Sequence, residues 1–136
     1  MAKCVEELQV WQRAERLARE VFAATEEQGF RRHPRLVEQL NESADSVLCN
    51  LAEGFGQNTD RGFARFVAIA RGSCNELRSH LAIAAIRRCI SDDRRAALHQ
   101  AADELSRMLT GLERYLLQCN RRRGDSCDNT VPKPTR

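Results

Sequence analysis

A chain of 136 residues is long enough for one domain with a single hydrophobic core. Hydrophobic residues make up 42% of it and charged residues 30%, which excludes a disordered protein, and no apolar stretch is long enough to predict a membrane span. The net charge of +3 lies wholly in positions 121–136, so positions 1–120 are formally neutral and do not by themselves indicate a nucleic-acid-binding protein.

Residues 8–25 form the first stretch in which apolar side chains recur at helical spacing. A main stripe spans the whole stretch, and a second stripe contains Val10, Leu17 and Ala24. An apolar side this broad predicts a helix that contacts more than one neighbour. The pattern stops near Gly29.

The second stretch, 36–55, has the most regular apolar stripe of the chain. Pro34 precedes it, at the first-turn position where a helix tolerates proline. The stripe ends at Gly54-Phe55-Gly56. We expect a glycine in the left-handed conformation to cap the helix there.

Two further helical stretches follow, at 63–84 and 98–119. The segment 58–60 (Asn-Thr-Asp) offers three side chains that could cap the first of them. The segment 91–93 (Ser-Asp-Asp) offers a cap for the second, with two carboxylates in the first turn, where the helix dipole favours negative charge.

Four helices of roughly 20 to 30 residues, each about 30 to 45 Å long, are thus expected. Short connections between long helices favour antiparallel neighbours, and nothing in the sequence alternates with the period of a strand. We therefore predict an all-α protein, an antiparallel up-down-up-down four-helix bundle formed by residues 1–122. Residues 123–136 lack an apolar stripe and are predicted to form a disordered C-terminal tail.

Neither a metal site nor a catalytic site is predicted. His33, His80 and His99 lie on different stretches, and none has a second ligand at a known metal spacing. A phosphate-binding glycine loop, a nucleophile elbow and a catalytic triad are all absent from the sequence. We expect no catalytic, metal-binding or cofactor-binding residue, no cofactor, and a protein that is not an enzyme.

The six cysteines are scattered along the chain without a closely spaced pair. Most fall in or beside the expected helices, which favours small apolar side chains in a reducing compartment over disulfides or metal ligands. The first ten residues contain two acidic residues where a signal peptide would have an apolar run. These features predict a cytoplasmic protein that has no membrane partner.

Some polar residues and glycines interrupt the stripes. Asn50 and Glu53 are neighbours on one helix, and two interpretations remain open: they hold the helix to its surroundings, or they line a functional groove. We expect Glu76 to pair with an arginine. The positions to which we assign such structural roles are Asn50, Glu53, Gly54, Gly72, Glu76 and Gly111.

Gly72 and Gly111 each lie inside a helical stretch, where glycine costs about 1 kcal/mol relative to alanine. We expect a neighbouring backbone or a bulky side chain, with Trp11 as a candidate, to pass close to them. A ligand-binding turn at Arg71-Gly72-Ser73 is the alternative.

Apolar residues also occur away from the main stripes, in excess of what one bundle interior needs. An exposed patch of this kind usually marks an interface between subunits or with a partner. We therefore predict self-association through a surface that contains Val10, Leu17, Ile69, Ile83, Ile86 and Ile90.

Four blocks of the sequence together resemble a known family. They are 8–12 (Leu-Gln-Val-Trp-Gln), 50–56 (Asn-Leu-Ala-Glu-Gly-Phe-Gly), 69–77 (Ile-Ala-Arg-Gly-Ser-Cys-Asn-Glu-Leu) and 107–112 (Arg-Met-Leu-Thr-Gly-Leu). In order and spacing, over about residues 6–118, the chain is similar to the bacterial four-helix bundle proteins encoded by intervening sequences of 23S rRNA genes.

The resemblance implies an antiparallel bundle whose copies assemble as ring-like or barrel-like homopentamers, without enzymatic activity. A more distant similarity is to the accessory protein of diversity-generating retroelements, a basic pentamer that binds nucleic acid and a reverse transcriptase. This chain departs from the family pattern at 39–45, where neutral or acidic residues replace two arginines. A neutral body attracts phosphates less strongly.

Two functional hypotheses follow. The first is an oligomeric interaction scaffold, whose partners are further copies of itself and possible other proteins. The second is an RNA- or DNA-binding module, in which oligomeric symmetry multiplies a modest basic patch. An arginine run is also a favourable end to a helix, against the negative end of its dipole, and this interpretation stays open for 121–123. The residues that the second hypothesis uses are Arg31, Arg32, Arg35, Arg121, Arg122 and Arg123.

Overall fold

The computed structural model describes residues 2–128, which contain helices and no strand. Two short 3-10 helices are η1 (Val5–Glu7) and η2 (Gln28–Phe30). The long helices are α1 (Gln9–Thr25), α2 (Pro34–Phe55), α3 (Asp60–Ile86) and α4 (Asp92–Asp128). For the described residues, the prediction of an all-α protein with four long helices is confirmed.

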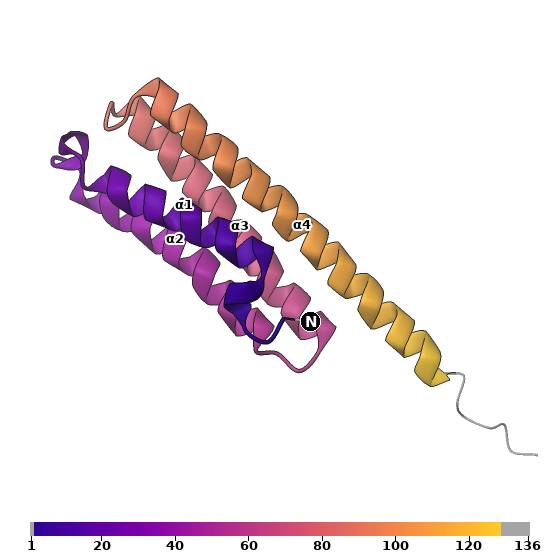
Figure 1. The fold of residues 1–136 in the computed structure, drawn as a ribbon. Helices are drawn as coiled ribbons and strands as arrows, with labels where there is room; N and C mark the ends of the chain where they lie inside the picture. Colours follow the sequence, from indigo (N-terminus) through magenta and orange to yellow (C-terminus); the bar gives the residue numbers. More distant parts are fainter. Residues whose placement is uncertain (1, 129–136) are drawn as a thin grey trace, which may run out of the picture.

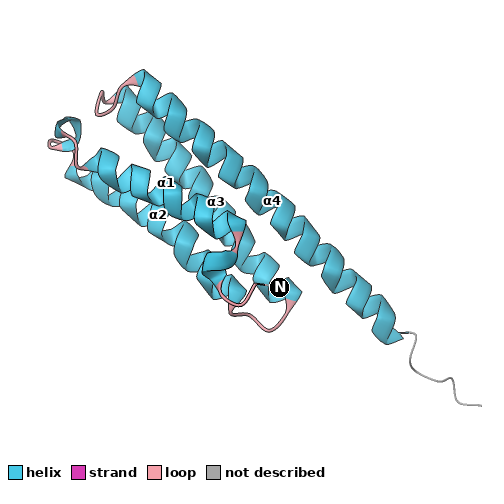
Figure 2. Ribbon diagram, in the orientation of Figure 1, coloured by secondary structure: helices cyan, strands magenta, loops and turns pink. Residues whose placement is uncertain are grey.

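The four long helices lie side by side and are joined by short connections (Figures 1 and 2). Contacts join α1 to α2, α2 to α3, α3 to α4 and α1 to α4, so each helix packs against two neighbours. The α1–α2 and α3–α4 connections lie at one end of the bundle, and the α2–α3 connection lies at the other end (Figure 1). Two separate loops therefore share one end of the molecule.

Side-chain caps begin α3 and α4. The Thr59 hydroxyl accepts a hydrogen bond from the backbone N–H of Gly62 at 3.0 Å, and the Ser91 hydroxyl accepts one from the backbone N–H of Arg94 at 3.1 Å. Both hydroxyls satisfy amides that have no partner inside the helix. Pro34 stands in the first turn of α2, as its sequence position predicts.

The left-handed glycine expected at the end of α2 is not there. Gly56 has φ −77° and is right-handed, because it continues the α-helical pattern with a hydrogen bond from its N–H to Ala52 O (3.2 Å), and a tighter 3-10 bond from Gln57 N to Gly54 O (3.1 Å) then ends α2. Among the described residues, no glycine has a positive φ. The residue with a positive φ is Arg88 (59°), beyond the end of α3.

Arg88 closes the end of α3. Its backbone N–H donates to the carbonyl of Ala85 at 3.0 Å, and the N–H of Cys89 donates to the carbonyl of Ala84 at 2.8 Å. This pair of hydrogen bonds defines a Schellman motif with an arginine at the left-handed position. The chain then turns inward, so that Cys89 and Ile90 are both buried.

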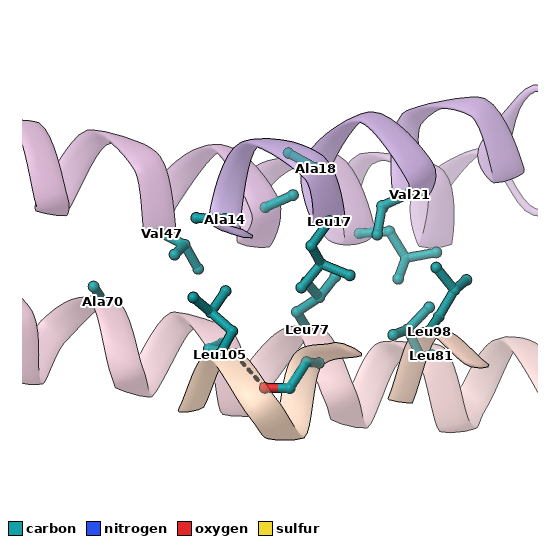
Figure 3. Close-up of a cluster of buried hydrophobic side chains, with 14 of the residues drawn as sticks. Ala14, Leu17, Ala18, Val21, Val47, Ala70, Leu77, Leu81, Leu98 and Leu105 are labelled. Carbon is teal, nitrogen blue, oxygen red and sulfur yellow. Dashed lines mark hydrogen bonds between the residues drawn. The ribbon is translucent and has the colours of Figure 1, made fainter. Parts of the chain in front are cut away.

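The core is a continuous apolar cluster to which all four long helices contribute. Leu17 of α1 points across the interior toward Leu77 of α3, as Figure 3 shows. The second stripe of the first helix is buried, and its main stripe is buried from Ala14 onward, because α1 packs against α2 on one side and α4 on the other. The largest fully buried side chains are Leu40, Leu51, Leu77, Leu81, Leu105 and Leu109.

Helix α4 continues to Asp128, beyond the boundary predicted at residue 122. Nothing before Pro132 forbids helical geometry, and a single glycine at 124 costs a helix only about 1 kcal/mol. The absence of an apolar stripe therefore marks where packing ends, and the helix itself goes further. The remainder of the predicted tail, 129–136, lies outside the described residues.

Candidate functional site

Arginines from two segments meet at the end of the bundle that holds two connections. Arg32 and Arg35, at the start of α2, line a groove of about 310 Å³ together with Arg87, which follows α3. Arg31 is exposed next to them in the chain. Arg35 has an ion pair with Glu38, at 3.6 Å and largely exposed, which contributes little. This end is therefore more basic than the sequence indicates.

Arg87 lies beside the arginines of α2 because the α1–α2 connection touches the α3–α4 connection. Gly29, in η2, lies against the backbone of Cys89, and a side chain at position 29 would collide with it. This close approach holds the α1–α2 loop beside the α3–α4 loop. The sequence did not predict this contact, because Gly29 indicated only the end of a helix.

Arg121, Arg122 and Arg123, the other predicted basic set, are exposed near the C-terminal end of α4, at the opposite end of the bundle (Figure 1). The Nη1 atom of Arg123 lies 3.2 Å from Oδ2 of Asp60, at the start of α3. The structure therefore does not bring the two predicted arginine sets together within one chain.

A second groove, of about 490 Å³, lies near the start of α3 and faces α4. Arg61 and Arg65 line it from α3, and Glu113 and Leu117 line it from α4. The sequence reading did not single out these two arginines. Their spacing of four residues on a helix was the signal that could have identified them.

Half of the predicted interface positions are exposed, and all of these lie on α3. Their exposed fractions are 44% for Ile69, 40% for Ile83 and 79% for Ile86. Tyr115 of α4, which the prediction did not include, is exposed as well. Exposed isoleucine is costly in water, so this face of α3 is a candidate contact surface.

For Val10, Leu17 and Ile90 the interface prediction is wrong. Their exposed fractions are 6%, 3% and 7%, and all three belong to the core cluster. Val10 and Leu17 fill the second side of α1, which has two neighbours, and Ile90 folds inward after α3. A partner cannot reach these side chains while the chain is folded.

Asn50 takes part in a hydrogen-bond network that joins α2 to α3. Its amide donates to the backbone oxygen and to the hydroxyl of Ser46, at 2.8 and 3.1 Å. The Ser46 hydroxyl is 2.7 Å from that of Ser73 on α3. Glu53 is exposed, and its backbone carbonyl accepts a bond from the Gln57 side chain. For Asn50, this supports the interpretation of a structural tie.

Among the described residues Glu76 has no arginine partner. Its Oε1 lies 3.6 Å from Nε2 of His80, one turn further along α3. Because the Glu76 side chain is 64% exposed, the pair contributes little to stability.

The explanation predicted for Gly72 and Gly111 is wrong, since a Cβ at either position would meet nothing within 4 Å. Both residues are exposed, and Trp11 does not fill space beside them. Gly54 is the glycine that packing requires on α2, because a Cβ there would lie 2.8 Å from Phe63 and 2.9 Å from Phe66.

Two buried thiols and one phenol of the described part have raised pKa values. Burial raises the pKa of the Cys74 thiol to about 11, and burial also raises the pKa of Cys89. A hydrogen bond with Cys119 raises the pKa of Tyr115. All three groups are neutral at physiological pH, and a neutral thiol is a weak nucleophile. The described residues contain no cluster of three potential metal ligands, and no described helix is long and apolar enough to span a membrane.

Sequence comparison supplies the family. No curated protein matches the chain at a significant level. The sequence pattern of the family described as 23S rRNA-intervening sequence protein matches residues 6–111. These residues span most of α1 to α4. They include the four sequence blocks that carry the resemblance, except for Leu112. The chain belongs to the family of 23S rRNA-intervening sequence proteins.

Proposed function

We propose that this protein is a non-enzymatic interaction scaffold, an up-down-up-down antiparallel bundle that assembles with copies of itself into a homopentameric ring. The observation that carries the proposal is the exposure of Ile69, Ile83 and Ile86 on α3. A single chain gains nothing from isoleucines in water, whereas burial between copies recovers about 25 cal/mol for each Å² of apolar surface. The antiparallel order is supported by the alternation of the connections between the two ends (Figure 1).

The charges on neighbouring helices support a second copy as the occupant of this face. Helix α2 exposes Glu42, Asp45 and Glu53 along one side, at helical spacing. Helix α3 exposes Arg61 and Arg65 in the turns before Ile69. An acidic α2 of one copy is complementary to the basic start of α3 in the next copy.

A contact between two different faces repeats around a closed ring if its rotation closes. Gly72 is exposed three residues beyond Ile69, and a glycine there permits a close approach of a helix from another copy. This accounts for a glycine that costs α3 stability although the space around its Cβ position is open within its own chain. The proposal places the ring in the cytoplasm, where reducing conditions suit the unpaired thiols of the described cysteines.

Light scattering coupled to size exclusion at micromolar concentration tests the proposal. We expect a particle of about five times the chain mass of 15.5 kDa. The Ile69→Lys variant places a charge in the contact and is expected to run as the monomer. Ala23→Lys adds the same charge to an exposed position of α1 and should leave the ring intact. A wild-type particle of 15.5 kDa contradicts the proposal.

A second function, RNA or DNA binding, is favoured by the basic end of the bundle. Arg31, Arg32 and Arg35 are joined there by Arg87, and ring symmetry would repeat the group. A titration with structured RNA and duplex DNA across a salt series tests it, because affinity that comes from phosphate contacts falls steeply with salt. Replacing Arg32 and Arg87 by glutamine should reduce the salt slope, and salt-independent absence of binding contradicts this function.

A further inference from the structure

A polar groove between α3 and α4 contains none of the residues on which the functions proposed above rest. It has a volume of about 510 Å³ and lies toward the α3–α4 connection, on the described part of both helices. The residues that line it are Asn75, Arg78, Ser79, Ala82, Arg95 and His99. Two positive side chains and two neutral donors thus share one concave surface.

Both arginines in the groove are partly withdrawn from water. The side chain of Arg78 is 29% exposed, and Arg95 is also half-buried. The Nε atoms of Arg78 and Arg95 are buried and have no hydrogen-bond partner among the described residues. Because each guanidinium has lost part of its hydration, an anion at the remaining N–H groups recovers more free energy than it would beside a fully hydrated arginine.

The positive charge of the groove is only partly neutralised. Arg78 Nη2 lies 3.4 Å from Oδ1 of Asp103, but Oδ2 of the same carboxylate is closer, at 3.1 Å, to Arg107. One carboxylate is therefore shared by two arginines. Arg95 has no ion pair within the described chain, although the exposed Asp92 lies one turn before it on α4.

The neutral residues of the groove point to an acceptor ligand. Nε2 of His99 is 3.5 Å from Arg78 Nη2, and because arginine has donors only, it is Arg78 that donates in this contact. Oδ1 of Asn75 accepts from Arg78 and from Ser106, each at 3.5 Å. The amide nitrogen of Asn75 is left as a donor with no described partner.

We propose that this groove is a phosphate-binding site, in which Arg78 and Arg95 hold the anion and the Asn75 amide donates to it. The planar guanidinium fork matches phosphate oxygens two at a time, so both side chains suit this anion. The ligand group is a phosphate monoester or diester, as carried by a nucleotide or by a nucleic-acid backbone. The site is separate from the basic end formed by Arg32, Arg35 and Arg87.

Side-chain NMR of the full chain tests the proposal, because Arg78 and Arg95 each carry a buried Nε–H that should give a resolved signal. Inorganic phosphate, titrated at constant ionic strength, is expected to shift both signals along a saturable curve. Arg95→Gln is the chosen variant, since Arg95 has no ion pair to break, and it should weaken phosphate binding about tenfold. Arg16→Gln removes the same charge from the exposed side of α1 and should leave binding unchanged.

A nucleoside 5′-monophosphate and a short RNA, titrated in the same way, distinguish the two sources of phosphate. Tighter binding of the RNA, lost in Arg95→Gln, assigns the groove to a nucleic-acid backbone, and tighter binding of the monophosphate assigns it to a nucleotide. Thermal melting of Arg95→Gln confirms that the variant is folded. The proposal is overturned if the two Nε–H signals do not move, if they move without saturation, or if the folded Arg95→Gln variant binds phosphate as the wild type does.

Discussion

Gly29 and Cys89 touch through their backbones, which fastens the α1–α2 connection to the α3–α4 connection. A Cβ built on Gly29 would lie 2.9 Å from the carbonyl carbon of Cys89 and 3.1 Å from its Cα, and closer still to its carbonyl oxygen. The obstacle is main chain at the end of a Schellman motif, so it cannot rotate away as a side chain could. The contact also keeps Arg87 beside Arg32.

Gly29→Ala should therefore destabilise the fold. We expect the free energy of unfolding to fall by about 1 to 3 kcal/mol, the range typical of a group forced into a packed site. Urea unfolding followed by circular dichroism measures the change.

Gly111→Ala is the matched control, because a Cβ there meets nothing within 4 Å. Alanine is the better helix former, so this variant should gain up to about 1 kcal/mol. Equal effects from the two substitutions would show that the backbone contact at Gly29 is not tight.

Arg88 provides a second backbone test, since it has φ 59° where glycine is the usual residue. Arg88→Gly removes the steric cost of a side chain in the left-handed region and should raise the free energy of unfolding by about 1 kcal/mol. Arg87→Gly is its control, because Arg87 has φ −79° and gains nothing from glycine. If Arg88→Gly also destabilises the protein, the side chain of Arg88 contributes a contact that outweighs its strain.

The helices could be predicted from the sequence because their signals are local. The stripe around Leu40 and Leu51 and the caps at Thr59 and Ser91 each depend on residues a few positions apart. The Gly29–Cys89 contact joins segments that are distant in the chain, and no local pattern announces it. For the same reason, Arg87 could not be assigned to the basic end beforehand.

The sequence also did not decide which apolar side chains outside the main stripes are buried. Leu17 and Ile69 both fall away from a main stripe, yet Leu17 is buried and Ile69 is exposed. The difference is that both sides of α1 that carry these apolar positions pack against neighbours, α2 and α4, whereas Ile69 lies on a side of α3 that neither of its neighbours, α2 and α4, covers within the described chain. Periodicity finds such positions and cannot say whether a neighbour covers them.

Alanine substitutions separate these two kinds of position. Leu17 is 3% exposed, so Leu17→Ala should lower the free energy of unfolding of the protein by about 2 to 5 kcal/mol. Ile86 is 79% exposed, so Ile86→Ala should change the free energy of unfolding by no more than about 0.5 kcal/mol under conditions in which the protein is dissociated. Denaturant titrations at low protein concentration give both values, and a large loss for Ile86→Ala would place that side chain in the core of the single chain.

The buried thiol of Cys74 makes stability depend on alkaline pH. Burial raises its pKa from 9.0 to about 11, while its Sγ donates to the carbonyl of Ala102 at 3.3 Å. Below pH 9 the thiol is protonated in the folded and unfolded states, so it adds no pH dependence. Between pH 9 and pH 11 the unfolded thiol ionises while the folded one keeps its proton, so the unfolded state is favoured as pH rises.

The free energy of unfolding of the wild type should therefore fall, relative to that of Cys74→Ala, by about 2 to 3 kcal/mol across this window. The comparison with Cys74→Ala removes the contributions of Cys89 and of the exposed Cys4 and Cys49, which both proteins share. Urea unfolding at half-unit steps from pH 8 to pH 11 supplies the two curves. A constant difference between them across the whole range would show that the Cys74 thiol ionises as readily in the folded protein as in the unfolded chain, and therefore that its surroundings between α3 and α4 admit water.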